Sequence, residues 1–296
     1  MLHSKVQKDL FGDPLPERVV NVASVPHRSP FRYPGGKTWL VPRLRQWLRH
    51  LRDKPDRFVE PFAGGAIIGL TVAVERLAEK VVLVELDDSV AAVWQTILSD
   101  DNEWLAQRIE NFELSENSVR KALSETSQSI RDNAFKTILK NRTFHGGILA
   151  PGSSLIKFGE NGKGISSRWY PKTIAGRIRD IYSIRENIEF VHGDGIASIR
   201  EHSSNPQNAF FIDPPYTAAG KRAGSRLYLH HALDHQLLFS TTSEVAGDFL
   251  MTYDNAEALV SMAKEHKFET RTIAMKNTHH AVMNELLIGR DLSWVG

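Results

Sequence analysis

The sequence predicts an α/β fold in which a mostly parallel sheet is wound with helices. From residue 58 onward, short apolar runs that are typical of strands alternate with longer stretches that have helical periodicity. Several of these runs end at an acidic or polar residue, and no stretch of the chain repeats another. In an open α/β sheet, ligands bind outside the carboxyl ends of the strands. The polar residues that follow the predicted strands are therefore the first candidates for a functional site.

Composition limits the class of protein. A chain of 296 residues, 41% hydrophobic and 24% charged, has room for one large domain or two modest ones. The absence of cysteine excludes disulfides, thiolate metal sites and a cysteine nucleophile, and we expect no metal site. No apolar run approaches the ~20 residues of a membrane helix, and the N-terminus lacks a signal-peptide core, so we expect a soluble, cytoplasmic protein. The formal net charge is only +2, so a nucleic-acid footprint would have to be a local basic patch.

The N-terminal part combines a predicted arm with a glycine-rich turn. Residues 1–30 contain four prolines and little periodicity, so we expect a loosely packed arm. The segment Phe31-Arg32-Tyr33-Pro34-Gly35-Gly36-Lys37 then predicts a turn that opens an amphipathic helix reaching Arg52. The backbone N–H groups of such a turn, with Gly36 and the Lys37 ammonium, suit an anionic group, and Tyr33 offers an aromatic face. A plain helix start with a surface lysine is the structural alternative.

Residues 58–85 have the pattern of a βαβ unit. A short strand ends at Glu60-Pro61-Phe62, a turn contains Gly64 and Gly65, and a helix follows that we expect to reach Lys80. Glu85, followed by Leu86, ends the second strand 20 residues after Gly65, a position at which an acid can accept hydrogen bonds from ribose hydroxyls. The fingerprint G-x-G-x-x-G is not met, so the pattern favours a nucleoside pocket over a dinucleotide site. A purely structural turn is the alternative.

The middle of the chain predicts helices and then a basic, glycine-rich segment. Residues 89–140 have helical periodicity, and residues 174–182 resume it. Between them, the stretch 141–170 interleaves basic and aromatic residues, as phosphate contacts and base stacking would require, although a solvated loop has the same composition. The candidate nucleic-acid contacts in this stretch are Asn141, Arg142, Lys157, Lys163 and Arg168. Asn141 and Arg142 have an alternative role, in which they only brace the loop.

The stretch Asp213-Pro214-Pro215-Tyr216 carries the strongest chemical signal. An apolar run that ends at Ile212 is stopped by two prolines, which lack N–H donors, so the carboxylate and the Tyr216 ring are presented at the end of a strand. The glycine-bearing basic segment that follows, with Lys221 and Arg222, suits a flap over a substrate.

Upstream, the strand 188–191 ends near Asp194, which could accept an amino group or form an Asx turn. Later strands are predicted at 249–253 and 285–288, and a helix is predicted to begin at Asp234.

The motif and its order in the chain resemble a known family. Asp-Pro-Pro-Tyr is the signature of amino-methyltransferases that methylate exocyclic nitrogens of DNA bases. The turn at 31–37, the glycine loop at 58–65, an insertion and then the motif at 211–216 resemble the Dam-type, D12 class DNA adenine-N6 methyltransferases over roughly residues 31–290. The chain departs from that group at three places: Tyr33 stands where Trp is frequent, Gly64-Gly65-Ala66 replaces Gly-Ala/Ser-Gly, and Glu85 stands where Asp is usual.

The resemblance implies a fold, a cofactor and a reaction. It implies a Rossmann-like S-adenosylmethionine-dependent methyltransferase sheet with a helical insertion: residues 31–95 and 185–296 would be catalytic, and residues 96–184 would recognise the target in double-stranded DNA. The cofactor would be S-adenosyl-L-methionine, held by the turn at 33–37, Glu60 to Gly65, Glu85, Leu86, Asp194 and Asp213. The target adenine would flip out of the duplex, stack on Tyr216, and donate its two amino N–H groups to Asp213 and the Pro214 carbonyl during direct in-line transfer. A companion restriction endonuclease is one partner that such an enzyme can have.

Two other functions stay open from the residues. A cytosine-N4 methyltransferase has the same fold and a similar motif, although such enzymes more often have Ser in place of Asp213. A non-catalytic module that binds DNA or a nucleoside would need no intact Asp213 to Tyr216 motif. The residues also leave open RNA as the nucleic acid.

Overall fold

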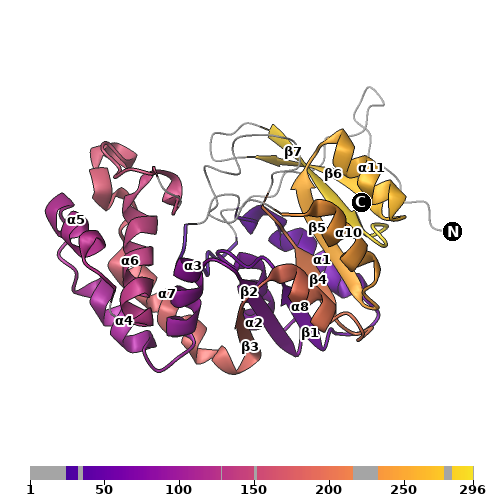
Figure 1. The fold of residues 1–296 in the computed structure, drawn as a ribbon, viewed down its shortest axis with the longest axis horizontal. Coiled ribbons are helices and arrows are strands. Elements are labelled where there is room, and N and C mark those ends of the chain that lie inside the picture. Colours follow the sequence, from indigo (N-terminus) through magenta and orange to yellow (C-terminus); the bar gives the residue numbers. More distant parts are fainter. Residues whose placement is uncertain are drawn as a thin grey trace, which may run out of the picture.

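The computed structural model describes residues 25–32, 36–127, 129–149, 152–215, 233–276 and 282–295. Within these residues, seven strands form one sheet in the order β3-β2-β1-β4-β5-β7-β6 (Figure 1). Strands β1 to β5 are mutually parallel, whereas β7 runs antiparallel to both β5 and β6. The strands are β1 Arg57–Glu60, β2 Lys80–Glu85, β3 Ile188–His192, β4 Ala209–Ile212, β5 Asp248–Asp254, β6 Glu269–Lys276 and β7 Val282–Gly289.

Helices cover both faces of the sheet and also form a separate group. Within the described residues, no helix is both long enough and apolar enough to cross a membrane. The helices are α1 Val41–His50, α2 Ile67–Glu75, α3 Asp88–Ile97, α4 Asn102–Glu110, α5 Glu116–Ser124, α6 Ile130–Thr143, α7 Pro171–Ser183, α8 Gly195–Glu201, α10 His235–Ser243 and α11 Glu257–Glu265.

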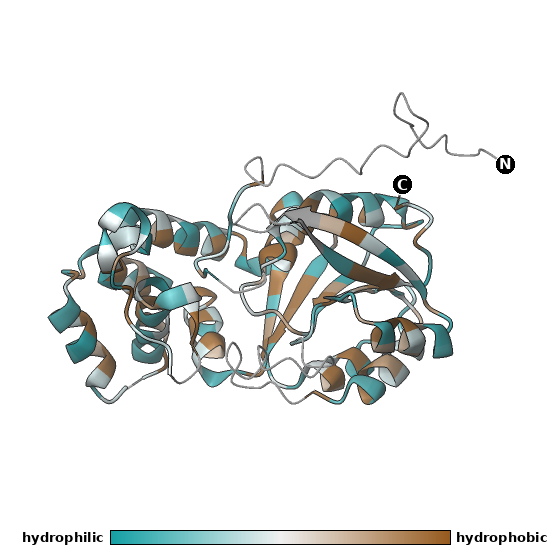
Figure 2. Cartoon of the chain, turned by 90° about the horizontal axis from the view of Figure 1, so that it is seen from above, coloured by the Kyte–Doolittle hydropathy of each residue, from teal (hydrophilic) through white to brown (hydrophobic). Residues whose placement is uncertain are grey.

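Two apolar cores follow from the alternation of side chains along the strands. Phe58, Leu83 and Phe211 point to one face, where they pack with α1, α2 and α3. Their sequence neighbours point to the other face and pack with α8, α10 and α11; Val59 and Phe210 are examples. Figure 2 shows the central strands as hydrophobic along most of their length, as burial on both faces requires. This arrangement confirms the predicted fold class.

The stretch expected to be an insertion is mostly helical. Helices α4 to α7 gather at one end of the molecule, at the left of Figure 1. They share the core of the α1–α3 face, to which they contribute Leu105, Ile138 and Ile178. The expected boundary between residues 95 and 96 falls inside α3, which continues to Ile97. Helix α3 is therefore shared by the sheet and the helical group.

Three local expectations differ from the structure. Helix α2 ends at Glu75 rather than Lys80, because Arg76 adopts a left-handed conformation (φ 52°) that closes the helix. Strand β6 had no counterpart among the expected strands: it lies at the edge of the sheet, and its Glu269-Thr270-Arg271-Thr272 start lacks an apolar run. Residues 29–31, partly inside the expected arm, are buried in the domain.

Candidate active site

The candidate site lies at the carboxyl end of β4, beside β1. The chain winds outward from β1 through β2 to β3, and outward in the other direction from β4 to β5, so the winding reverses between β1 and β4. Such a reversal is where an open α/β sheet has its ligand crevice. Strand β4 ends at Ile212, as the two prolines predicted, and Asp213 follows directly. Asp213 therefore stands at the mouth of the expected crevice.

Polar side chains gather on one face at this end of the sheet. Because side chains alternate along a strand, Asp213 continues the face of Phe211, and Glu60 continues the face of Phe58. The hydroxyl of Thr252, on β5, donates a hydrogen bond of 2.8 Å to Oδ1 of Asp213. Neighbouring strands thus bring together residues that are about 150 and 40 positions apart in sequence.

Lys37 joins two carboxylates in this cluster. Its Nζ lies 3.0 Å from Oδ1 of Asp213 and 3.3 Å from Oε1 of Glu285. Lys37 is 3% exposed and Glu285 is 4% exposed. The turn was expected to offer Lys37 to an anionic group of a ligand, but in the structure the anions that Lys37 meets belong to the chain itself. Gly36, which precedes it, is exposed.

Glu60 is an internal brace rather than a surface residue. It is buried, and Oε2 accepts a hydrogen bond of 2.8 Å from the backbone N–H of Gly69 in α2. A Cβ at position 69 would lie 2.5 Å from that oxygen, so only glycine allows this approach. Burial raises the pKa of Glu60 well above its usual range, and the charge of Asp213 adds to the rise. Glu60 therefore fixes α2 to the end of β1.

The glycine loop is held by the carboxylate of Glu85. Its oxygens accept hydrogen bonds of 2.9 Å from the backbone N–H groups of Gly64, Leu86 and Asp87. Burial raises the pKa of Glu85 to about 7, although these three donors oppose the rise. The indole of Trp94 donates to the carbonyl of Gly64 at 3.0 Å and holds the loop from the other side. The loop is thus fixed to β2 and α3.

Several residues around this loop lie near the protein surface or contact the start of α8. Leu86, directly after the end of β2, is 43% exposed. Phe62 packs partly buried against the core of the α8 face. A Cβ on Gly195 would lie 2.4 Å from the carbonyl oxygen of Pro61, so the start of α8 touches the loop. Asp194 is exposed and caps α8 by accepting the N–H of Ala197 at 2.8 Å, which is the local turn that the sequence left as an alternative.

Asn141 and Arg142 lie inside the protein. The Asn141 amide accepts the backbone N–H of Arg32 at 2.8 Å and donates to the carbonyls of Arg32 and Gly147 at 3.1 and 2.8 Å. The Arg142 guanidinium donates to the carbonyl of Pro30. Both side chains are buried, so their positions correct the expectation of DNA contact and favour the bracing role. They tie α6 to the segment that leads to Lys37.

The segment 152–170, which we call the basic loop, has a different character. Lys157 and Lys163 are exposed, and the ring of Phe158 is 81% exposed. Arg168 is half-buried, with Nε 3.7 Å from Oε1 of Glu160. Glu160 Oε1 also lies 3.4 Å from the guanidinium of Arg32, so the basic loop is linked to the chain just before Lys37.

Four of the expected residues, Tyr33, Tyr216, Lys221 and Arg222, lie outside the described residues.

Two residues of the cluster were not singled out from the sequence. Thr252 belonged to a predicted strand with a polar end, but nothing in the sequence paired that strand with β4. Glu285 directly precedes the apolar run 286–288, and a charge that is buried with such a run has to be paired, which was a usable signal.

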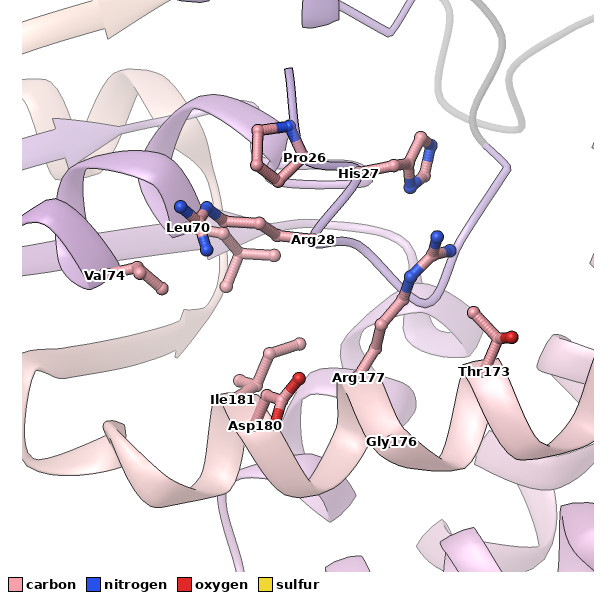
Figure 3. Close-up of a pocket in the computed structure, with 10 residues that line it drawn as sticks. All are labelled: Pro26, His27, Arg28, Leu70, Val74, Thr173, Gly176, Arg177, Asp180 and Ile181. Atoms are coloured by element: carbon pink, nitrogen blue, oxygen red, sulfur yellow. The ribbon is translucent and has the colours of Figure 1, made fainter. Parts of the chain in front are cut away.

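A separate pocket of about 310 Å³ lies between the N-terminal segment, α2 and α7 (Figure 3). Arg177 extends from α7 toward this segment, and its guanidinium donates to the carbonyl of Ser29 at 3.1 Å. His27 lies on the pocket wall and keeps part of its surface exposed; partial desolvation and the charge of Arg177 lower its pKa to about 4, so its imidazole is neutral near pH 7. None of the residues expected in catalysis or cofactor binding lines this pocket.

Comparison with known proteins gives a family and a set of similar folds. Residues 33–148 match the family model of the D12 class N6 adenine-specific DNA methyltransferases. No curated protein matches the sequence. Similar solved structures include the rRNA methyltransferase aviRa from Streptomyces viridochromogenes (14% identity, 89% of each chain, TM-score 0.38). They also include a methyltransferase from Geobacter sulfurreducens (11% identity, 88% of this chain and 80% of that chain, TM-score 0.39).

Proposed function

The chain carries a D12 class N6 adenine-specific DNA methyltransferase domain, and from this premise we propose that it methylates the N6 amino group of specific adenines in duplex DNA. The observation that carries the proposal is Asp213 at the reversal point of the sheet, held by Lys37 and Thr252. The family depends on S-adenosylmethionine, and DNA is its substrate class.

The chemical task of the site is to make an amino nitrogen nucleophilic. The lone pair of an adenine amino group is delocalised into the ring, so the nitrogen must become pyramidal before it can accept a methyl group. Lys37 and Thr252 both bind Oδ1 of Asp213, which fixes the plane of the carboxylate. We assign the acceptance of the two amino N–H groups to Oδ2 of Asp213 and the carbonyl of Pro214. Acceptors that are fixed in advance stabilise the charge that develops on the nitrogen in the transition state.

The residues around the glycine loop fit S-adenosylmethionine. Exposed Leu86 offers an apolar surface to an adenine ring, and Glu85 beside it can add a ribose hydroxyl to the three N–H donors it already accepts, since a carboxylate has about four acceptor positions. When bound, the cofactor supplies a methyl group on a sulfonium centre. The contact between Gly195 and Pro61 keeps the loop close to the start of α8, which Asp194 caps.

The basic loop supports the duplex part of the proposal. Exposed Lys157 and Lys163 suit phosphate contacts, and an exposed phenylalanine between them suits stacking on a base that has lost its neighbour. The link from Glu160 to Arg32 leads toward Lys37 and the catalytic carboxylate. Removal of the target adenine from the stack costs a few kcal/mol, roughly what one or two such contacts offset. A companion endonuclease and a cytoplasmic location stay predictions of the sequence.

Transfer of a labelled methyl group tests the proposal. Unmethylated duplex DNA is incubated with the protein and methyl-labelled S-adenosylmethionine, and the product is digested to nucleosides. Label in N6-methyladenosine supports the proposal. Label in N4-methylcytosine would assign the runner-up reaction, and DNA binding without any label would assign a non-catalytic role. Single-stranded DNA and RNA as parallel substrates determine which nucleic acid is used.

A further inference from the structure

The strand β7 contributes a buried acid to the catalytic cluster. Glu285 pairs in register with Asp254 of β5 and with Ile273 of β6, in the middle of the antiparallel part of the sheet. Its neighbours Leu286, Leu287 and Ile288 are all buried in the two cores. A carboxylate in such a strand is costly unless it is paired. Its Oε1 lies 3.3 Å from Nζ of Lys37.

One ammonium group therefore serves two carboxylates. Lys37 contacts Asp213 at 3.0 Å and Glu285 at 3.3 Å, and the lysine is almost completely buried. A lysine side chain has four rotatable bonds and a point charge, so a single partner leaves its direction poorly fixed. A second partner on β7, which is paired with β5 on one side and β6 on the other, restricts the ammonium to a position between the two acids. Oδ1 of Asp213 then has one defined donor position from Lys37 and another from Thr252.

The second acid also changes the charge that Asp213 experiences. A full ammonium that is paired with Asp213 alone would withdraw electron density from the carboxylate and weaken it as an acceptor. When Glu285 also contacts the ammonium, it compensates part of the positive charge, so Asp213 accepts a hydrogen bond from the substrate amino group more strongly. Glu60 is the other acid nearby, and burial raises its pKa well above its usual range.

We propose that Glu285 is a positioning residue for methyl transfer, which orients the Lys37 ammonium and shares its charge so that Asp213 stays aligned and strong as an acceptor. This inference rests on the function proposed above. A purely structural role is the competing explanation, because a buried lysine needs a counter-charge for folding alone. The two explanations differ in what they expect from variants that keep the fold.

The decisive variant is Glu285→Gln, which keeps the shape and an acceptor oxygen but removes the charge. We expect kcat to fall roughly tenfold to a hundredfold, in line with the cost of small misplacements of catalytic groups. KM for S-adenosylmethionine and the affinity for DNA should stay within about threefold. Glu285→Asp, which restores the charge one methylene further back, should give an intermediate kcat. Glu265→Gln, which removes an exposed charge from α11, is the matched control and should behave as wild type.

Several results would overturn the inference. One is a Glu285→Gln variant with a lowered melting temperature and a wild-type kcat, because this would mark the role as structural. Another is a Glu285→Asp variant with a wild-type kcat. Calorimetric cofactor binding shows whether each variant is folded. If Glu285→Gln does not fold, the kcat of Glu285→Asp decides between the two explanations. A third is an equal loss of kcat in Glu265→Gln. If the wild-type protein transfers no methyl group, the proposed function fails and this inference fails with it. If the wild type is active and the Glu285 variants match it, this inference alone fails.

Discussion

The position of the Asp213 carboxylate depends on its contacts with residues from other parts of the chain. Asp-Pro dipeptides end many strands, and the sequence identified this one only because Pro215 and Tyr216 follow. Lys37, in the turn that precedes α1, and Thr252, in β5, belong to parts of the chain that are far from Asp213 in sequence. Local sequence therefore located the acid, whereas only the strand order could show how the acid is held.

The first prediction concerns Asp213→Ala. We expect methyl transfer to be lost by at least a hundredfold, because the acceptor of the substrate amino group is gone. The fold should survive, since Lys37 keeps Glu285 as its counter-charge. Cofactor affinity, measured by calorimetry, should stay within a few-fold. A loss of turnover below tenfold, ~1.4 kcal/mol of barrier, would remove Asp213 from the proposed role. Asp53→Ala, an exposed acid before β1, is the control.

A second prediction uses the raised pKa of Glu85. Because burial raises this pKa to about 7, the carboxyl gains a proton as the pH falls below 7, and the proton occupies one of its acceptor positions. The affinity for S-adenosylmethionine should therefore weaken by up to about tenfold for each pH unit below 7 and level off above it. Calorimetry at pH 6, 7 and 8 measures this. Glu85→Gln should bind weakly at every pH, and a variant that kept the pH dependence would assign it to another group.

At the scale of elements, the strands were easier to predict than the loops. The six expected strands are present, because each has an apolar run that two buried faces require. Strand β6 was missed since an edge strand with one solvated face carries Thr and Arg in place of that run. Helix α2 was expected to be too long, because a left-handed Arg76 leaves no mark in the sequence.

The basic loop shows the same limit for function. Its composition predicted phosphate contacts, and Lys157 and Lys163 are exposed as that role needs. Composition did not separate them from Arg142, which is buried and bonded to Pro30, or from Arg168, which lies near Glu160. Only the tertiary contacts show which cations have internal acceptors.

A third prediction concerns the two exposed lysines. Lys157→Gln combined with Lys163→Gln should weaken binding to DNA of any sequence. The slope of log K against log salt should fall by up to ~0.9 for each lost phosphate contact. Cofactor affinity should not change. The control pair, Arg49→Gln with Arg52→Gln, removes the same charge from exposed positions next to the amino end of β1. Equal effects from both pairs would indicate general electrostatics instead of an interface in the basic loop.

A fourth prediction concerns Phe158, whose ring is 81% exposed. Phe158→Ala should leave the free energy of unfolding within about 0.5 kcal/mol, because the side chain packs on little. If the ring stacks on a base, DNA affinity should fall by ~1–3 kcal/mol. The fluorescence of 2-aminopurine at the target position should also show less flipping. Val260→Ala, an exposed apolar residue on α11, is the matched control. A variant with wild-type affinity and flipping would leave Phe158 without a role in DNA binding.

At the scale of the whole molecule, the segment 25–32 connects the parts of the site. Ser29 and Pro30 accept hydrogen bonds from Arg177 and Arg142, and the buried ring of Phe31 lies 5.8 Å from that of Trp94, which holds the glycine loop. Prolines and charges predicted an arm here, because the contacts that bury it come from residues more than sixty positions away in the sequence. The helical group and Lys37 are thus joined through one short segment.

The last prediction tests this connection through Asn141→Ala. The substitution leaves the backbone N–H of Arg32 and the carbonyls of Arg32 and Gly147 without the amide they bind, so the free energy of unfolding in urea should fall by about 1–3 kcal/mol. Asn111→Ala, at an exposed helix end, should cost much less. If Asn141 only braces the segment, the methylated sequence should stay the same and the rate should fall, because Lys37 lies five residues beyond Arg32. A variant that methylates a different sequence at unchanged stability would return Asn141 to the DNA interface, and the basic loop would then have to be repositioned in the complex to expose it.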